Sequence, residues 1–158
     1  MSKLNERLTL VANLSVVVGI VFLATELRQN TEAIRSQTRD SITEKQMTYL
    51  GWRATSPELA MAIAQVDSAG LGSLTSWERE LMGAYVGGIY REWENSFYQY
   101  ERGLFTPDEF EARRVFWRRQ LLDSPDSEAF RELWALGGDS FAPGFRAEIN
   151  RILRETPS

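Results

Sequence analysis

The sequence predicts an all-α protein with one N-terminal transmembrane helix that continues into a membrane-proximal helix, followed by a compact domain of about five helices. Residues 8–24 contain no charged side chain. Helix start signals recur through the rest of the chain, and no useful stretch alternates between polar and β-branched residues as a half-buried strand would. At 158 residues the chain suits one domain with one appendage.

The composition excludes several classes of chemistry. Histidine and cysteine are both absent, which removes thiol nucleophiles, disulfides, imidazole or thiolate metal ligands, and the commonest general base. The 18 basic and 22 acidic residues give a formal charge of −4, which is not the basic footprint of a nucleic-acid-binding protein. We therefore expect no catalytic residue, no metal site, no cofactor and no nucleic-acid partner.

Residues 8–24 are the segment expected to cross the lipid bilayer. About 20 apolar residues cover roughly 30 Å of hydrocarbon, and only Glu26 interrupts the apolar run before Leu27 ends it. A cleaved signal peptide needs small residues at positions −3 and −1, which FLATELRQ does not offer. An interfacial helix needs a charged face through its middle, which is also missing. A buried core helix stays open as an alternative.

One face of this segment carries small residues. Ala12, Ser15 and Gly19 recur at spacings of three and four, so another helix can approach them closely. The same spacing leads on to Glu26, and Asn13 lies beside the stripe as a polar handle. We predict that these five residues form a helix-packing interface with other transmembrane subunits or with a second copy. The alternative is that small residues are simply common in transmembrane helices.

Charge near the ends of the segment predicts its orientation. Two basic residues precede the apolar run and four follow it within about 20 residues. We therefore expect the C-terminal bulk in the cytoplasm and the N-terminus outside. No glycine or proline follows the run until Gly51, so one helix over about 8–50 is expected, continuous or kinked. The expected regions are a transmembrane anchor (1–27), a membrane-proximal helix (28–55) and a helical soluble domain (56–158).

Start and stop signals divide the soluble domain into helices. Ser56-Pro57 opens the first, and capping boxes at Thr75-x-x-Glu78 and Thr106-x-x-Glu109 open the next two. The remaining signals are Gly103 closing a long helix from Trp77 to Arg102, Ser124-Pro125 starting a helix that ends at Gly137-Gly138, and Pro143 opening a last one to about Arg154.

The long helix is expected to form the centre of the domain core. Its apolar residues wind over much of its circumference, in a track of Trp77, Leu81, Tyr85, Ile89, Trp93 and Phe97. An aromatic ligand pocket lined by Tyr85, Trp93 and Phe97 is the alternative to plain core packing. Gly83, Gly87 and Gly88 weaken the helix by up to about 1 kcal/mol each, but let neighbouring backbones come close.

Two clusters of charged residues are candidate sites. Glu94, Tyr98 and Glu101 share one side of the long helix with Glu92 nearby, which would suit acid–base chemistry or a hard cation, although a structural hydrogen-bonding role is favoured. Basic residues form the second cluster, and we predict lipid headgroup contact for Arg28, Arg114 and Arg118. For the arginines near residue 116, the favoured alternative is that they are solvated and paired with carboxylates.

Three short motifs resemble those of a widespread family of small bacterial single-span membrane proteins. They are Leu23-Ala24 with Arg28-Gln29-Asn30-Thr31, Ala33 and Arg35; Glu94-Asn95 with Tyr98-Gln99-Tyr100 and Gly103-Leu104; and Phe141, Pro143, Phe145 and Arg146. Glu26 departs from the glutamine expected there. The resemblance implies a bacterial source, and hence the inner membrane, and a hydrophobic helix that runs through an RQNT segment into an α-helical domain. It implies no activity.

These observations favour a non-enzymatic single-pass protein that works by association. We expect an accessory or assembly subunit of a larger membrane complex, such as a respiratory or photosynthetic one, in contact with the lipid bilayer and with other transmembrane subunits. The alternative is a membrane-tethered sensor whose aromatic domain binds a lipid or another apolar ligand.

Overall fold

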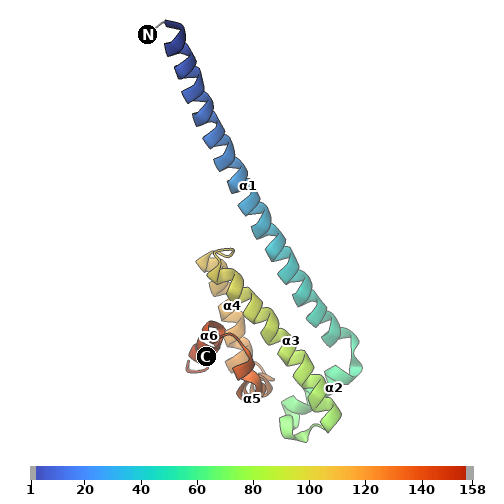
Figure 1. Ribbon diagram of the computed structural model, residues 1–158. Coiled ribbons are helices and arrows are strands. Elements are labelled where there is room, and N and C mark those ends of the chain that lie inside the picture. Colours follow the sequence, from blue (N-terminus) through green and yellow to red (C-terminus); the bar gives the residue numbers. More distant parts are fainter. Residues whose placement is uncertain (1–2, 156–158) are drawn as a thin grey trace. The chain divides into compact units, whose positions relative to one another are not determined.

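The computed structural model describes residues 3–155, apart from the side chain of Leu4, and every regular element in this range is helical. The all-α prediction is confirmed (Figure 1). The helices are α1 (Lys3–Thr55), α2 (Pro57–Ala69), η1 (Leu71–Ser73), α3 (Ser76–Glu101), α4 (Pro107–Arg118), η2 (Arg119–Asp123), α5 (Ser127–Gly137), η3 (Gly138–Ser140) and α6 (Pro143–Ile152). The chain divides into two compact units, Met1–Arg39 and Asp40–Ser158.

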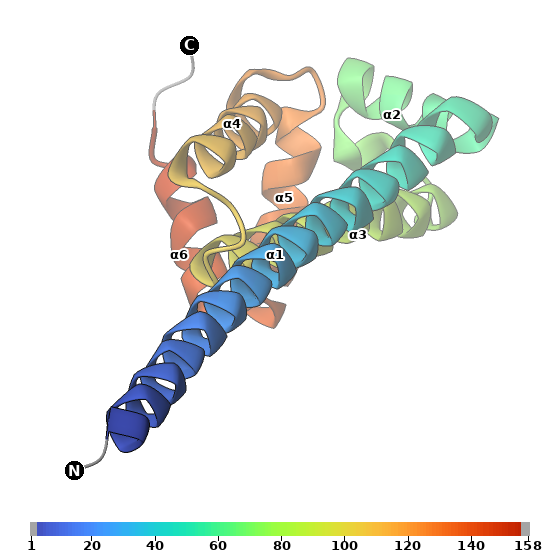
Figure 2. The same ribbon diagram turned by 90° about the horizontal axis from the view of Figure 1, so that it is seen from above.

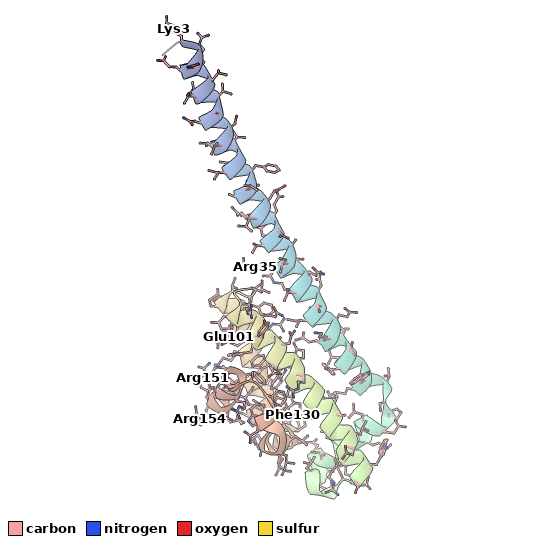
Figure 3. All side chains as sticks on the ribbon, in the orientation of Figure 1. Lys3, Arg35, Glu101, Phe130, Arg151 and Arg154 are labelled. Atoms are coloured by element: carbon pink, nitrogen blue, oxygen red, sulfur yellow. The ribbon has the colours of Figure 1, made fainter. Side chains whose placement is uncertain are left out.

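The first unit consists of the N-terminal part of α1, and the helix continues to Thr55 in the second unit. From residue 5 to residue 30 every side chain is exposed, and the side chains stand out around the helix in Figure 3. Its hydroxyl groups are satisfied by the helix itself, because Thr9, Ser15 and Thr25 each donate to the carbonyl four residues earlier at 2.9 Å. The unit boundary at residue 39 falls inside the expected membrane-proximal segment 28–55.

Local capping explains where α2, α3 and α4 begin. Ser56 accepts a hydrogen bond from the Leu59 amide, and both predicted capping boxes are present. In each box the threonine hydroxyl accepts from the glutamate amide three residues on, while that carboxylate accepts from the threonine amide. Gly103, which follows the end of α3, has a positive φ of 72° that favours glycine. These start signals are confirmed.

The start of α5 differs from the prediction. The helix begins at Ser127 rather than at Ser124, because residues 119–123 continue α4 as one wide turn of π-helix. The Ser124 hydroxyl donates to the Gln120 carbonyl at 2.8 Å, so it closes the preceding helix instead of capping the next one. Gln120 also donates to the Asp126 carboxylate at 2.7 Å, which fixes the connection between the two helices.

The core of the second unit surrounds α3, with α2 beside its first half and α4, α5 and α6 around the rest (Figures 1 and 2). Trp93 is 1% exposed and lies between Trp117 and Phe130, with ring centroids 5.4 and 6.0 Å away and nearly parallel planes. The Tyr90 hydroxyl donates to the Phe130 carbonyl at 2.8 Å. Trp77 departs from the predicted core track, because at the start of α3 it is 60% exposed.

Candidate functional site

The predicted helix-packing face lies on the exposed surface of the first unit. Ala12, Ser15 and Gly19 are exposed, and a Cβ atom built on Gly19 meets nothing within 4 Å, so this face is open. Ser15 already has its hydrogen bond within the helix. The amide of Asn13 makes no hydrogen bond to any described residue, and is therefore the polar group of this face that an apolar environment would leave in need of a partner.

Glu26 and Arg28 lie where the apolar run ends, and both are exposed. Arg28 forms an ion pair with Glu32 at 3.2 Å, one turn further along α1. The two side chains are 82% and 61% exposed, so in water the pair contributes at most about 1 kcal/mol to stability. Exposure leaves the Arg28 guanidinium open to other anions as well.

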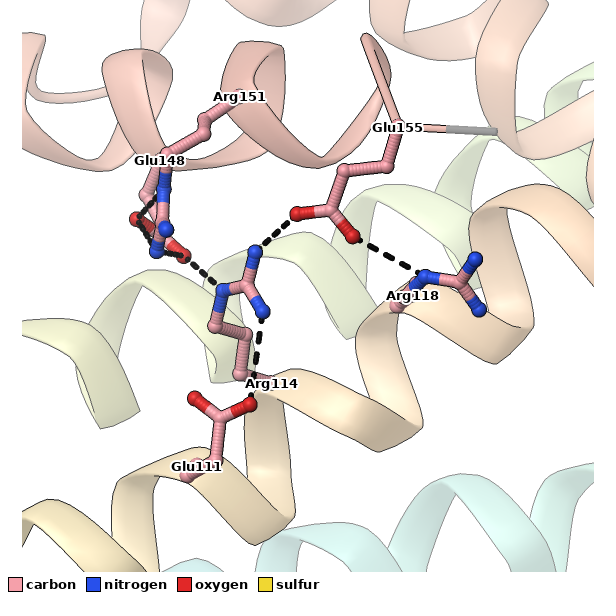
Figure 4. A network of polar contacts seen from close by, with 6 residues as sticks. All are labelled: Glu111, Arg114, Arg118, Glu148, Arg151 and Glu155. Atoms are coloured by element: carbon pink, nitrogen blue, oxygen red, sulfur yellow. Dashed lines mark hydrogen bonds and ion pairs between the residues drawn. The ribbon is translucent and has the colours of Figure 1, made fainter. Parts of the chain in front are cut away.

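Figure 4 shows where the predicted headgroup ligands Arg114 and Arg118 lie in the helical domain. Arg114 donates to Glu148 at 3.0 Å and to Glu155, and Arg118 donates to Glu155 at 3.0 Å. The Arg114 side chain is only 12% exposed. The carboxylate-paired alternative is therefore the arrangement that the structure has, and the two arginines join α4 to the C-terminal segment around α6.

An open groove lies between α3 and α5, with a volume of about 470 Å³. Its lining combines small residues of α3 with apolar residues of α5 and of the segment after it: Gly83, Ala84, Gly87, Gly88, Tyr90, Arg91, Leu133, Leu136, Gly137, Ser140 and Phe141. Leu136 is 81% exposed at this groove. The sequence reasoning missed the groove, because residues from two helices about 50 positions apart form it.

Tyr85, Trp93 and Phe97, the residues of the alternative aromatic pocket, do not line this groove. Tyr85 and Trp93 are buried, and Phe97 packs against Phe110 and Phe145 with ring centroids 5.9 and 6.1 Å away. Those three side chains belong to the packed core, as the favoured interpretation of the aromatic residues predicts.

Glu94 has the structural role that the sequence favoured. Its Oε1 accepts the backbone N–H of Ala142 at 2.7 Å, and its Oε2 accepts from Arg91 at 2.8 Å. Ala142 is the N-cap residue of α6, and Glu94 of α3 accepts its backbone N–H, the bond that an N3 glutamate makes in a capping box. Tyr98 is 47% exposed, and among the described residues no group of acidic side chains could hold a metal ion.

Replacing Glu94 with alanine is expected to lower the free energy of unfolding by about 1 kcal/mol, because the backbone N–H of the N-cap residue Ala142 loses its charged acceptor. Glu94→Gln keeps an amide oxygen at that position and is expected to lose less. Chemical denaturation followed by circular dichroism measures both. Glu101→Ala, an exposed change on the same helix, is the matched control, and an equal loss in that variant would contradict the assignment.

A buried polar cluster surrounds Glu92 on α3. This residue is 4% exposed, and its Oε1 accepts from the Ser96 hydroxyl at 2.9 Å and from Gln46 of α1 at 3.3 Å. Arg113 of α4 lies 3.6 Å from the same oxygen. Sequence reasoning placed Glu92 only as a neighbour of Glu94. Glu92 follows Tyr85 by seven residues and precedes Ser96 by four, which places its carboxylate on the buried face of the helix. This spacing is the sequence signal that could have identified it.

Burial raises the pKa of Glu92, although Ser96, Arg113, Gln46 and Lys45 act in the opposite direction. A carboxyl group with a raised pKa binds its proton more tightly in the folded chain than in the unfolded one. Its contribution to stability is therefore complete below the ordinary pKa and is lost as the pH rises through the raised value.

The Glu92→Gln variant is expected to gain stability relative to the parent as the pH rises from acid to neutral, because the amide cannot ionise. Denaturation midpoints of both proteins, measured across this pH range, test the trend. Glu128→Gln, on an exposed position of α5, is the matched control. A difference between Glu92→Gln and the parent that does not change with pH would contradict the effect of burial.

Comparison with family models, with curated proteins and with solved structures finds no match to this chain. The resemblance to bacterial single-span proteins therefore stays a prediction from the sequence motifs. The open face of the first unit and the groove of the second unit are the candidate functional surfaces of the chain.

Proposed function

We propose that the protein is a non-enzymatic, single-pass membrane protein that acts by association, as an accessory or assembly subunit of a larger membrane complex. One observation carries the proposal. α1 contains a window of mean hydropathy 2.3 that is long and apolar enough to cross a membrane, and none of that window is buried in the structure. A continuous apolar surface of this kind is covered by lipid or protein rather than by water.

The hydrogen bonding of this window fits a position in lipid, although Thr31, Thr48 and Thr55 outside the window make the same bond. Hydrocarbon offers no partners, so polar groups there have to be satisfied within the helix. The hydroxyls of Ser15 and Thr25 meet that demand by bonding to carbonyls one turn earlier. A core helix of a soluble domain would instead have an apolar face buried by its own chain.

Association through the span is supported by the open face at Ala12, Ser15 and Gly19. Between lipid-embedded helices there is no hydrophobic drive to associate, so close packing and polar contacts supply the affinity. Gly19 leaves space for a neighbouring backbone, and the Asn13 amide is an unused donor and acceptor in the same span. We further propose that the C-terminal domain faces the cytoplasm of a bacterium, on the charge distribution and the family resemblance.

Purification from native membranes in a mild detergent tests this function. Integral membrane partners are expected to co-purify with the parent, and Gly19→Leu is expected to weaken that association about tenfold. Val17→Leu, on the opposite side of the helix, is the matched control and should retain the partners. The association proposal is wrong if the protein stays in the soluble fraction, or if it runs as a lone monomer that neither substitution changes.

Orientation has a separate test, because the chain contains no cysteine. A single Ser68→Cys substitution on exposed α2 would react with a membrane-impermeant maleimide only from the side that the domain occupies. Labelling is expected in inverted vesicles and not in intact cells. Labelling of intact cells would place the domain outside.

The groove between α3 and α5 favours a second candidate function, a membrane-tethered sensor or carrier of an apolar ligand. Its volume of about 470 Å³ lies in the range of small-molecule sites, and Leu133, Leu136 and Phe141 line it. Native mass spectrometry of the purified protein should then show a retained ligand. A spectrum of the bare chain alone would count against this candidate.

A further inference from the structure

We propose that the last part of α1 is a releasable arm, which packs on α3 while Glu92 holds a proton and separates from α3 when Glu92 ionises. The arm comprises residues 40–55, the part of α1 that belongs to the second unit. This inference goes beyond association through the span, because it concerns how the helical domain is tied to the helix that carries the span. It rests on the composition of the core, on the contacts under the arm and on the charges that face Glu92.

The hydrophobic core of the helical domain is complete without the arm. Every buried residue that the structure describes in the core cluster belongs to α2 or to a later part of the chain, from Leu59 to Ile152. The arm adds Tyr49, which is only partly buried against that cluster, and Ile42, which is 1% exposed but lies outside it. Release of the arm would therefore uncover little apolar surface, while the packing that stabilises α2 to α6 stays in place.

Polar and small residues of α3 lie under the arm. Gln46 donates to the Glu92 carboxylate at 3.3 Å. The ring of Tyr49 lies over Gly88, so closely that a Cβ atom built on the glycine would be 2.8 Å from it. Most other side chains of the arm are exposed. The C-terminal end of the arm stays attached in any case, because Ser56 joins it directly to α2.

Charged and titratable groups from two other helical segments face Glu92. α4 contributes Arg113, whose guanidinium lies 3.6 Å from the carboxylate, and the arm contributes Lys45 and Tyr49. On α3 itself the Ser96 hydroxyl donates to Glu92 at 2.9 Å. Ser96 and Arg113 belong to the domain, so both stay beside Glu92 when the arm leaves, and both favour the charged carboxylate.

The packed arm reverses this preference. With the arm in place, burial raises the pKa of Glu92 above its ordinary value in spite of the neighbouring donors and cations. Water reaches the carboxylate once Gln46 and Tyr49 have moved away, and the groups left beside it then hold its pKa at the ordinary value or below. Packing of the arm and proton binding are therefore linked. The packed arm is fully favoured below the ordinary pKa, and this preference is lost as the pH rises through the raised pKa.

Distances between spin labels in the full chain, reconstituted in nanodiscs, test the proposal. The chain has no cysteine, so Met47→Cys on the arm and Leu136→Cys on α5, both at exposed positions, give one label pair. One narrow distance is expected in acid. A second, broader population is expected to grow as the pH rises, by at most about tenfold per pH unit because one proton is released. Met61→Cys with Leu136→Cys, a pair within the domain, should keep one distance throughout.

The Glu92→Gln variant separates this linkage from other effects of pH. Its amide cannot ionise, so the arm is expected to stay packed, with one narrow distance, over the whole range. Gln46→Ala removes the donor on the arm and is expected to enlarge the released population about fivefold, whereas Thr43→Ala, at an exposed position of the same helix, should not. The proposal is overturned if the parent shows no pH-dependent population, or if Glu92→Gln responds to pH as the parent does.

Two glycine substitutions test the packing under the arm independently of charge. A Cβ atom on Gly88 would meet the ring of Tyr49, whereas one on the neighbouring Gly87 would meet nothing within 4 Å. Both changes to alanine favour the helix to the same extent. Gly88→Ala is therefore expected to enlarge the released population at every pH, and Gly87→Ala to leave it as in the parent. Equal distance distributions in the two variants would show that Tyr49 does not pack on Gly88, and would overturn the packed geometry of the arm.

Discussion

Replacing Trp93 with alanine is expected to lower the free energy of unfolding of the helical domain by about 3–5 kcal/mol. The side chain is 1% exposed and lies between the rings of Trp117 and Phe130, so its removal opens a cavity on α3 where three helices meet. Domains of ordinary size have a net stability of about 5–15 kcal/mol. The variant should therefore unfold at a much lower denaturant concentration.

Guanidinium denaturation followed by circular dichroism measures this loss. Trp77→Ala is the matched control, because it removes the same side chain from the same helix at a position that is 60% exposed. Its free energy of unfolding is expected to change by no more than about 0.5 kcal/mol. Comparable losses in the two variants would show that α3 is not packed as described.

Arg114→Met is expected to destabilise the domain by about 2 kcal/mol. Removing one partner from a fully buried ion pair costs about 3–5 kcal/mol, whereas exposed pairs contribute about 0–1 kcal/mol. Arg114 lies between these limits, with a side chain that is 12% exposed against 10% for Glu148 and 30% for Glu155. The substitution keeps much of the aliphatic stem but leaves two carboxylates with one donor fewer (Figure 4).

Arg119→Met is the matched control for this prediction. Arg119 follows on the same helical run, is exposed, and makes no ion pair with any described residue. Denaturation at low and high salt should show that the loss in Arg114→Met largely persists, since partly buried pairs are screened less than exposed ones. A loss that disappears in high salt would instead assign these arginines to the solvated surface.

Features that depend only on residues close together in the chain were predictable from the sequence. The caps at Ser56, Thr75 and Thr106 each need one partner three residues away, so spacing alone reveals them. The apolar window of α1 is likewise a property of consecutive residues. The start of α5 was predicted wrongly, because residues 119–123 extend α4 as a π-helical turn and the Ser124 hydroxyl bonds back to Gln120. The sequence Ser124-Pro125 does not by itself indicate this arrangement.

The chemistry of the candidate sites depends on residues far apart in the chain. Arg114 could be recognised as part of a basic cluster, but its partners Glu148 and Glu155 come from the end of the chain. In the same way, residues of both α3 and α5 form the groove. The sequence shows that its glycines weaken α3, but it does not show what lies around them. Composition and spacing predicted which residues are candidates for a site, whereas the packing of the helices determines which groups each residue contacts.

The way the helices begin has a consequence for synthesis of the chain. α2, α3 and α4 each begin at a residue whose own side chain caps them, so their first turns are favoured as soon as those few residues have emerged from the ribosome. The N-cap residues of α5 and α6 are Asp126 and Ala142, which make no side-chain cap, and the backbone N–H of Ala142 donates to Glu94 of α3. The C-terminal helices therefore depend on an α3 that is already in place, so we expect the domain to assemble from its N-terminal half onward.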